Sequence, residues 1–154
     1  MSLKALLLAI VGLPVAGPGF SGSEPELTQD EVIIRIQKLG GRVHVLEQQL
    51  GKPVARALSL KRFTDRDVPL LSGLATLIVL DLSGSRVTDK GLAHLKGLTS
   101  LEHLDLRDTP VTDKGLHAIK GLTALRLLDL AKTKVTAAGV KDLQRALPEL
   151  EIVR

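Results

Sequence analysis

The chain has no cysteine and almost no aromatic residues. Its 154 residues include no Cys, Trp or Tyr and only two Phe. Without cysteine, disulfides, thiolate metal sites and thiol nucleophiles are excluded. With only two aromatic rings, the chain offers too few side chains for bases to stack on, so we expect no nucleic-acid partner. A chain of this length supports one folded unit, whose core must be built from Leu, Val, Ile and Ala.

Concentrated charge and catalytic motifs are also missing. The formal net charge is +4, and no long run of one sign occurs. The cluster of Lys61, Arg62 and Arg66 is interpreted as a solvated face, with an anionic ligand as the alternative. No nucleophile elbow or phosphate-binding glycine loop is present, and the four histidines have no evident triad partner. We therefore predict that the protein is not an enzyme and uses no cofactor or metal.

The N-terminus has the outline of an export signal. Residues 1–16, MSLKALLLAIVGLPVA, place a lysine before a short apolar run that ends in small residues, as in a secretory signal peptide. The alternative is an apolar N-terminus that is buried or disordered. Residues 17–26 then read as a flexible spacer. We expect a secreted or periplasmic protein that is not stably inserted in a membrane after signal cleavage.

One hexapeptide occurs twice, and it reveals a repeat. VTDKGL stands at 87–92 and again at 111–116, 24 positions apart. At this period three units align, and a weaker, shorter one precedes them. The predicted units are residues 54–76, 77–100, 101–124 and 125–149, followed by a terminal strand at 150–154.

Each unit combines a strand with a helix. The pattern L-x-x-L-x-L, as in 101–106, alternates as a short strand does, whereas Leu92, Leu95 and Leu98 recur at helical spacing. Thr88 is a suitable helix N-cap, and we interpret the charge of Asp89 as favouring the helix N-terminus. A glycine within the first helical turn, at 91 and 115, costs helix stability, so we expect the neighbouring coil to approach closely there.

The motif LxxLDLxxTxVTDxGL resembles the leucine-rich repeat superfamily, specifically a short bacterial type with ribonuclease-inhibitor-like T-D-x-G-L repeats. The resemblance covers residues 54–154. It implies an α/β solenoid, a short right-handed curved stack with parallel strands on the concave side and short helices on the convex side. Ser85, Thr109 and Thr133 stand where the superfamily prefers Asn or Cys, so we expect hydroxyl hydrogen bonds to replace the usual asparagine ladder.

Residues 27–53 are predicted to cap the first unit. Thr28 and Glu31 form a capping box before a helix that ends at Gly40-Gly41. Two strands around residues 51–53 should then lead into the repeats.

The strand residues that point away from the leucines are the candidate partner-binding site. Strands pack about 4.8 Å apart and helices are about 10 Å wide, so the stack should curve with its strands inside. Three aspartates stack there, which suggests either an acidic stripe for a basic peptide or a repeat feature satisfied locally; a metal site through His103 has no supporting spacing. The candidate residues are Ser59, Lys61, Val79, Asp81, Ser83, His103, Asp105, Arg107, Leu127 and Asp129.

The resemblance implies that this concave face binds a partner protein. We therefore predict a non-catalytic protein–protein interaction module that binds a protein or peptide through the strand face. The alternative is a structural or accessory repeat protein that self-associates or joins a larger assembly.

Overall fold

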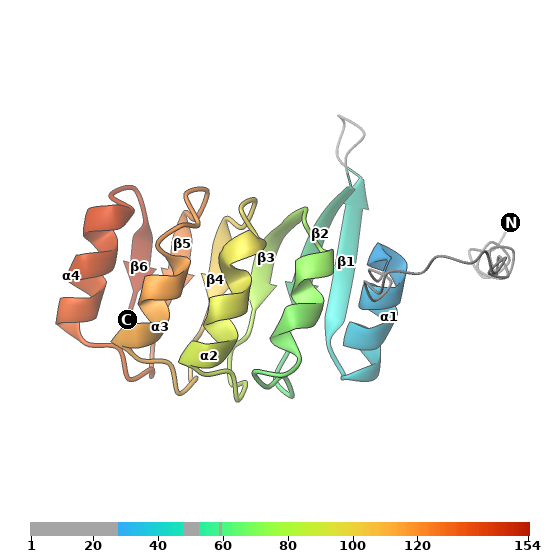
Figure 1. Ribbon diagram of the computed structural model, residues 1–154, viewed down its shortest axis with the longest axis horizontal. Helices are drawn as coiled ribbons and strands as arrows, with labels where there is room; N and C mark the ends of the chain where they lie inside the picture. Colours follow the sequence, from blue (N-terminus) through green and yellow to red (C-terminus); the bar gives the residue numbers. More distant parts are fainter. Residues whose placement is uncertain (1–27, 48–52, 59) are drawn as a thin grey trace, which may run out of the picture.

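The computed structural model describes residues 28–47, 53–58 and 60–154, which form a single six-stranded sheet with helices along one side (Figure 1). The strands follow one another in chain order, from β1 to β6. β1 pairs with β2 in antiparallel fashion, and every later neighbouring pair is parallel. Each parallel step returns through a helical segment, so the chain winds as an α/β solenoid.

Figure 1 shows the strands side by side and the helical segments in a row in front of them. The strands are β1 Arg42–Glu47, β2 Pro53–Leu58, β3 Leu77–Asp81, β4 His103–Asp105, β5 Leu127–Asp129 and β6 Glu151–Val153. The helical segments are α1 Gln29–Lys38, η1 Val68–Gly73, α2 Asp89–Leu92, η2 Ala93–Gly97, α3 Asp113–Ile119 and α4 Ala137–Ala146. We number the coils by the predicted units: coil 1 is 54–76, coil 2 is 77–100, coil 3 is 101–124 and coil 4 is 125–149.

Helix α1 covers the first coil, as predicted. Thr28 and Glu31 form the capping box, with the Glu31 side chain accepting a hydrogen bond from the Thr28 backbone N–H at 2.9 Å. The helix ends before Gly40, whose φ of 82° lies in the left-handed region. Val32 and Ile36 are fully buried against the core, so α1 shields the leucines that coil 1 would otherwise expose.

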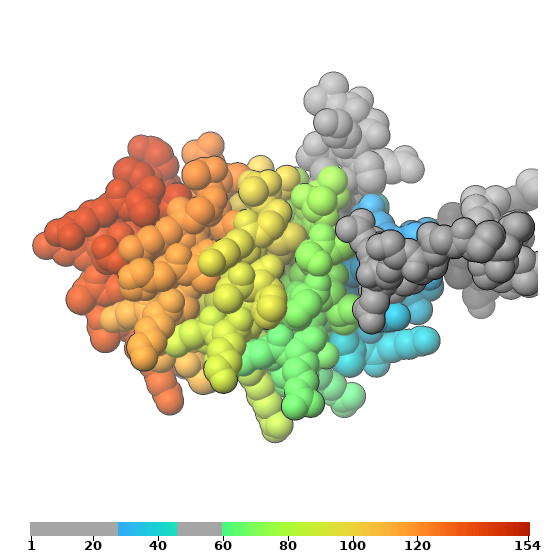
Figure 2. All heavy atoms as spheres, in the orientation of Figure 1, coloured from blue at the N-terminus to red at the C-terminus, as the bar shows by residue number. Residues whose placement is uncertain are grey.

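The core is a ladder of aliphatic side chains between the sheet and the helices, and the spheres of successive coils pack side by side in Figure 2. Equivalent leucines from each coil, such as Leu80, Leu104 and Leu128, are at most 2% exposed. The same aliphatic side chains recur at equivalent positions of successive coils and fill the core, and Phe63 is the one aromatic residue among the buried ones described. The predicted interior is therefore confirmed.

The helical segments of coils 1 to 3 are short, as the resemblance implies, and part of them is 3₁₀ helix. Coil 1 has the six-residue 3₁₀ helix η1, and the helical part of coil 2 begins with the four α-helical residues of α2 and continues as η2. The coil has to turn through sheet and helix within 24 residues, which favours single tight turns. Only coil 4 contains a ten-residue α-helix, α4, in this part of the chain.

A repeated set of hydrogen bonds joins each helix start to the coil before it. The carboxylate of Asp65 accepts the backbone N–H of Thr88 at 2.7 Å and its hydroxyl at 2.7 Å. Asp89 accepts the same two bonds from Thr112, at 2.8 and 2.6 Å. Asp113 accepts them from Thr136, at 2.7 and 2.6 Å. We call this contact the Thr–Asp link. The role that we assigned to Asp89 from its position at a helix start is therefore incomplete, because its oxygens bind the next coil.

These bonds shift the pKa of two of the linking carboxyls. Burial alone would raise the pKa of Asp65. Hydrogen bonds from Thr88 and Gly91 outweigh that effect, so the pKa lies below its usual value. The pKa of Asp113 is lowered mainly by the hydroxyl and then by the backbone N–H of Thr136. In these two links the charged carboxylate is therefore the form that joins the coils.

The expected close approach at the first-turn glycines is confirmed. A Cβ added at Gly91 would lie 2.6 Å from Asp65 Oδ1, and one at Gly115 would lie 2.5 Å from Asp89 Oδ1. At Gly139 the same atom would meet the Asp113 carboxylate. The glycine therefore makes room for the carboxylate of the preceding coil.

The expected hydroxyl hydrogen bonds are present, and each lies within a single coil. Thr109 Oγ1 donates to the Leu106 carbonyl at 2.6 Å, and Thr133 Oγ1 donates to the Leu130 carbonyl at 2.7 Å. They close the turn after each strand, whereas the Thr–Asp links join one coil to the next.

Among the described residues, no helix combines the length and apolar character needed to cross a bilayer.

Candidate functional site

The helices cover one face of the sheet, and the strand residues on the other face form what we call the open face. Successive strand side chains point to opposite faces, so Leu80 and Leu104 enter the core while their neighbours point outward. The strand register then aligns these outward residues in two rows across the sheet. One row is Val79, His103 and Leu127, and the other, which we call the acidic row, is Asp81, Asp105 and Asp129.

The open face contains a hollow of about 340 Å³. Both rows contribute to its lining, and Arg107 projects into it from the turn after β4. The lining residues are Val79, Leu80, Asp81, His103, Leu104, Asp105, Arg107, Leu127 and Asp129. The hollow thus contains both apolar side chains and carboxylates. On β3 and β5 the carboxylate follows the apolar residue by two positions.

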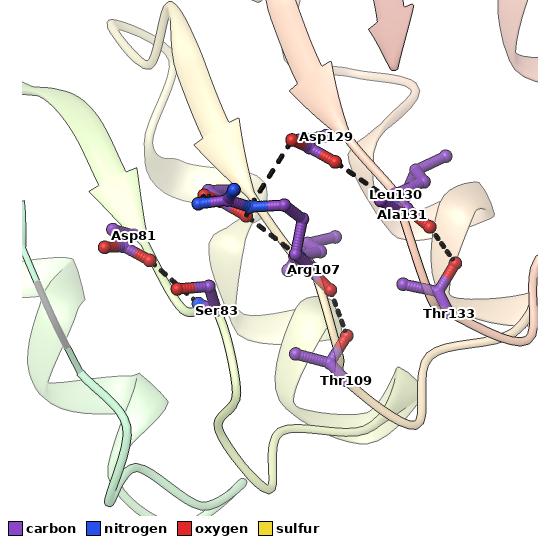
Figure 3. A network of polar contacts seen from close by, with 10 residues as sticks. Asp81, Ser83, Arg107, Thr109, Asp129, Leu130, Ala131 and Thr133 are labelled. Carbon is purple, nitrogen blue, oxygen red and sulfur yellow. Dashed lines mark hydrogen bonds and ion pairs between the residues drawn. The ribbon is translucent and has the colours of Figure 1, made fainter. Parts of the chain in front are cut away.

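Each carboxylate of the acidic row is held by its own coil. Oδ1 of each aspartate accepts the backbone N–H two residues later, at 2.9 Å in all three coils (Figure 3). The donors are Ser83, Arg107 and Ala131. These bonds fix the orientation of each carboxylate on the open face, in agreement with the local role that we weighed for them.

Arg107 bridges two carboxylates of the acidic row. Its Nη2 lies 2.7 Å from Asp105 Oδ2, and its Nε contacts both Asp105 oxygens at 3.1 and 3.0 Å. The contact to Asp129 is looser, at 3.4 Å from Nε to Oδ2 (Figure 3). The hydrogen bond to Asp105 is the main cause that raises the pKa of Arg107, followed by the charges of Asp105, Asp129 and Asp81. The guanidinium therefore stays charged and offsets part of the repulsion within the row.

Most of the predicted site residues come together. Seven of them line the hollow: Val79, Asp81, His103, Asp105, Arg107, Leu127 and Asp129. Ser83 is half-buried beside it and donates its backbone N–H to Asp81. Lys61 is exposed but does not line the hollow, and Ser59 lies outside the described residues.

Two further residues on the open face, Glu151 and Val153 of β6, are not among the predicted site residues. They pair in register with Leu127 and Asp129. The alternation of apolar Leu150 and Ile152 with these two positions carries the signal, since it is the same period-two pattern that identified the other strands.

A second group of polar side chains lies on the helix side, away from the hollow. His117 is on the helix side, where its Nε2 is 3.6 Å from Asp142 Oδ2, and Lys120 Nζ contacts the same oxygen at 2.6 Å. This contact joins α3 to α4. Within residues 28–47, 53–58 and 60–154, no three His or carboxylate groups are grouped so as to hold a metal ion.

Comparison with known proteins identifies the family of repeats that this sequence matches. Residues 75–135 match the family described as leucine rich repeat. Over these residues the chain has the fold of a leucine-rich repeat solenoid. The match spans β3 to the start of coil 4, which includes the whole hollow, and proteins built from such repeats generally act as non-enzymatic protein-binding modules. A search of curated proteins finds no match.

Solved structures with leucine-rich repeats also align with the solenoid. An internalin C2 from Listeria monocytogenes is 30% identical, with a TM-score of 0.45, and the alignment covers 55% of this chain and 34% of that one. A leucine-rich repeat protein from Leptospira interrogans is 21% identical, with a TM-score of 0.45, over 56% and 21%. The ectodomain of the receptor kinase SOBIR1 from Arabidopsis thaliana is 19% identical, with a TM-score of 0.46, over 81% and 78%. The alignments thus span about a third of the internalin and a fifth of the Leptospira protein.

Proposed function

We propose that this leucine-rich repeat protein is a non-catalytic interaction module that binds a partner protein or peptide through its open face. The observation that supports the proposal is the hollow, which is lined by side chains from three consecutive coils. A concave site with a few fixed polar groups among apolar ones is the usual form of a recognition surface.

The polar groups of the hollow are already oriented. Asp105 and Asp129 each accept a backbone hydrogen bond, and Arg107 is held between them. Groups that are fixed before binding lose little conformational entropy when a partner docks. Val79 and Leu127 are partly exposed beside them and would gain by being covered.

We also propose that the protein acts outside the cytoplasm. The support is the charged, apolar and small-residue pattern of residues 1–16, which lie outside the described residues.

The test is capture of a partner with baits that differ by one charge reversal. Wild type and Asp105→Lys would be used on the extracellular fraction of the producing cells, with Glu102→Lys as the matched control. Glu102 is exposed and precedes β4, and its side chain does not line the hollow. We expect a protein retained by wild type and by Glu102→Lys to be lost from Asp105→Lys, with at least a tenfold weaker affinity when the purified partner is titrated.

Circular dichroism must show that Asp105→Lys remains folded. Equal retention of every partner by all three baits would remove the open face from consideration. If the molar mass of the protein in solution then rises with its concentration, the alternative function, self-association, is favoured.

A further inference from the structure

The open face does not stop at the hollow but continues onto β6. Ile152 packs against the core, so Glu151 and Val153 on either side of it point to the open face. Both are exposed, and Val153 is 41% exposed although it is a large apolar residue. β6 is also the edge of the described sheet.

On the open face of β5 and β6, acidic and apolar side chains alternate both along each strand and across the strand pair. Leu127 lies opposite Glu151, and Asp129 lies opposite Val153. Each carboxylate therefore has an apolar neighbour across the strand pair and another two residues along its own strand. The two carboxylates lie on one diagonal and the two apolar residues on the other.

The two carboxylates are those best placed to accept a cation from outside. Asp129 has the looser of the two contacts with Arg107, at 3.4 Å compared with 2.7 Å for Asp105. The Glu151 side chain makes no hydrogen bond or ion pair with any residue that the structure describes. One guanidinium shared between Asp105 and Asp129 leaves this end of the face with an excess of negative charge.

We propose that the β5–β6 end of the open face binds an extended partner segment with basic residues at alternate positions. This inference rests on the proposed function and names the chemistry of its partner. A lysine or arginine side chain combines an apolar stem with a charged head, so its stem covers Leu127 or Val153 while its head reaches Asp129 or Glu151. In an extended segment, alternate residues are about 7 Å apart, which equals the spacing of residues 151 and 153 along β6.

Other segments fit this surface less well. An acidic segment would be repelled by the two carboxylates, which carry the same charge as the segment. A wholly apolar segment would displace water from Asp129 and Glu151 without offering them new hydrogen bonds. Charge complementarity therefore selects the basic segment, with the apolar pair adding contact area.

The experiment titrates the full chain with three blocked pentapeptides and follows backbone amide shifts by NMR. The probes are Lys-Ser-Lys-Ser-Lys, the acidic Glu-Ser-Glu-Ser-Glu, and Lys-Lys-Lys-Ser-Ser, which has the same composition in a different order. We expect the first to bind most tightly and to shift amides of β5 and β6. Glu151→Gln and Val153→Thr should each weaken its binding about two- to fivefold, the effect of losing one exposed contact.

Glu149→Gln is the matched control, because Glu149 is exposed and precedes β6, so the same charge is removed away from the open face. If Glu149→Gln and Glu151→Gln weaken binding equally, the β6 site is overturned. If Asp105→Lys abolishes peptide binding while both β6 variants bind as wild type does, the proposed function stands and this inference falls. Equal binding of the basic and acidic peptides by wild type would overturn this inference alone, because the proposed function specifies no charge for the partner.

Discussion

At the scale of single residues, three positions act together at each coil boundary. A threonine starts the helix, an aspartate of the previous coil accepts its N–H and hydroxyl, and a glycine leaves room for that aspartate. The threonine hydroxyl has a second role, since Thr112 Oγ1 also accepts the N–H of Lys114 in its own helix at 3.3 Å. One side chain thus caps a helix and fixes the distance between coils.

Replacing the glycine tests this arrangement. In Gly115→Ala the new Cβ would lie 2.5 Å from Asp89 Oδ1 and 2.9 Å from Leu92 Cδ1, so the link must open or the coil must shift. We expect a loss of about 1–3 kcal/mol in the free energy of unfolding, measured by urea denaturation. Gly121→Ala is the control, because a Cβ there meets nothing within 4 Å. Equal destabilisation by both substitutions would contradict the role of the close approach.

At the scale of elements, the sequence predicts what depends on local pattern and misses what depends on contacts between coils. The period-two leucines around Leu104 and the capping box at Thr28 identify a strand and a helix from neighbouring residues alone. The partner of Asp89 is 23 residues away, and nothing in its immediate neighbours distinguishes an inter-coil acceptor from a charge at a helix start. The replacement of the expected helix in coil 1 by 3₁₀ helix η1 likewise follows from tertiary packing, which overrides local preference.

Helix α1 offers a prediction at this scale. Ile36 is 0% exposed and Ile34, on the same helix, is 39% exposed. Truncating Ile36 to Ala leaves a cavity between α1 and coil 1, so we expect a loss of about 2–5 kcal/mol in the free energy of unfolding. Ile34→Ala should stay within about 0.5 kcal/mol of wild type. Chemical denaturation checks both, and similar values for the pair would mean that α1 does not cap the core.

At the scale of the whole molecule, most of the candidate surface could be predicted because the sheet repeats one register. Once the period is known, Asp81, Asp105 and Asp129 must lie side by side, and they do. The bridge that Arg107 makes between two of them could not be predicted, since a flexible side chain on a turn has no fixed direction in the sequence pattern. The extension of the open face onto β6 needed the register of the last strand pair.

The stability of the whole array should fall in acid, because the Thr–Asp links lose their charged carboxylates. The pKa values of Asp65 and Asp113 are lowered in the folded chain, so the unfolded chain binds more protons in acid. The stabilisation is therefore present above the unfolded pKa of about 3.9 and is lost as the pH falls through the lower folded pKa values. We expect the melting temperature to drop as the pH falls below about 4.

Asp65→Asn is the informative variant for this dependence. It should melt lower than wild type at pH 6, because an amide oxygen accepts hydrogen bonds less strongly than a carboxylate, and it should lose less on acidification. Asp30→Asn removes a carboxylate that no link uses and serves as control. Parallel pH curves for wild type and Asp65→Asn would show that the link does not titrate with folding.

The Thr–Asp link also determines how such an array can grow by duplication. A copied 24-residue segment carries its own threonine, aspartate and glycine, so the new boundary has donor, acceptor and space without any further substitution. Coil 4 is different, because Ala137 stands where the other coils have the aspartate. A unit joined after coil 4 would find no carboxylate to bind its threonine, whereas one inserted between coils 2 and 3 would be linked on both sides.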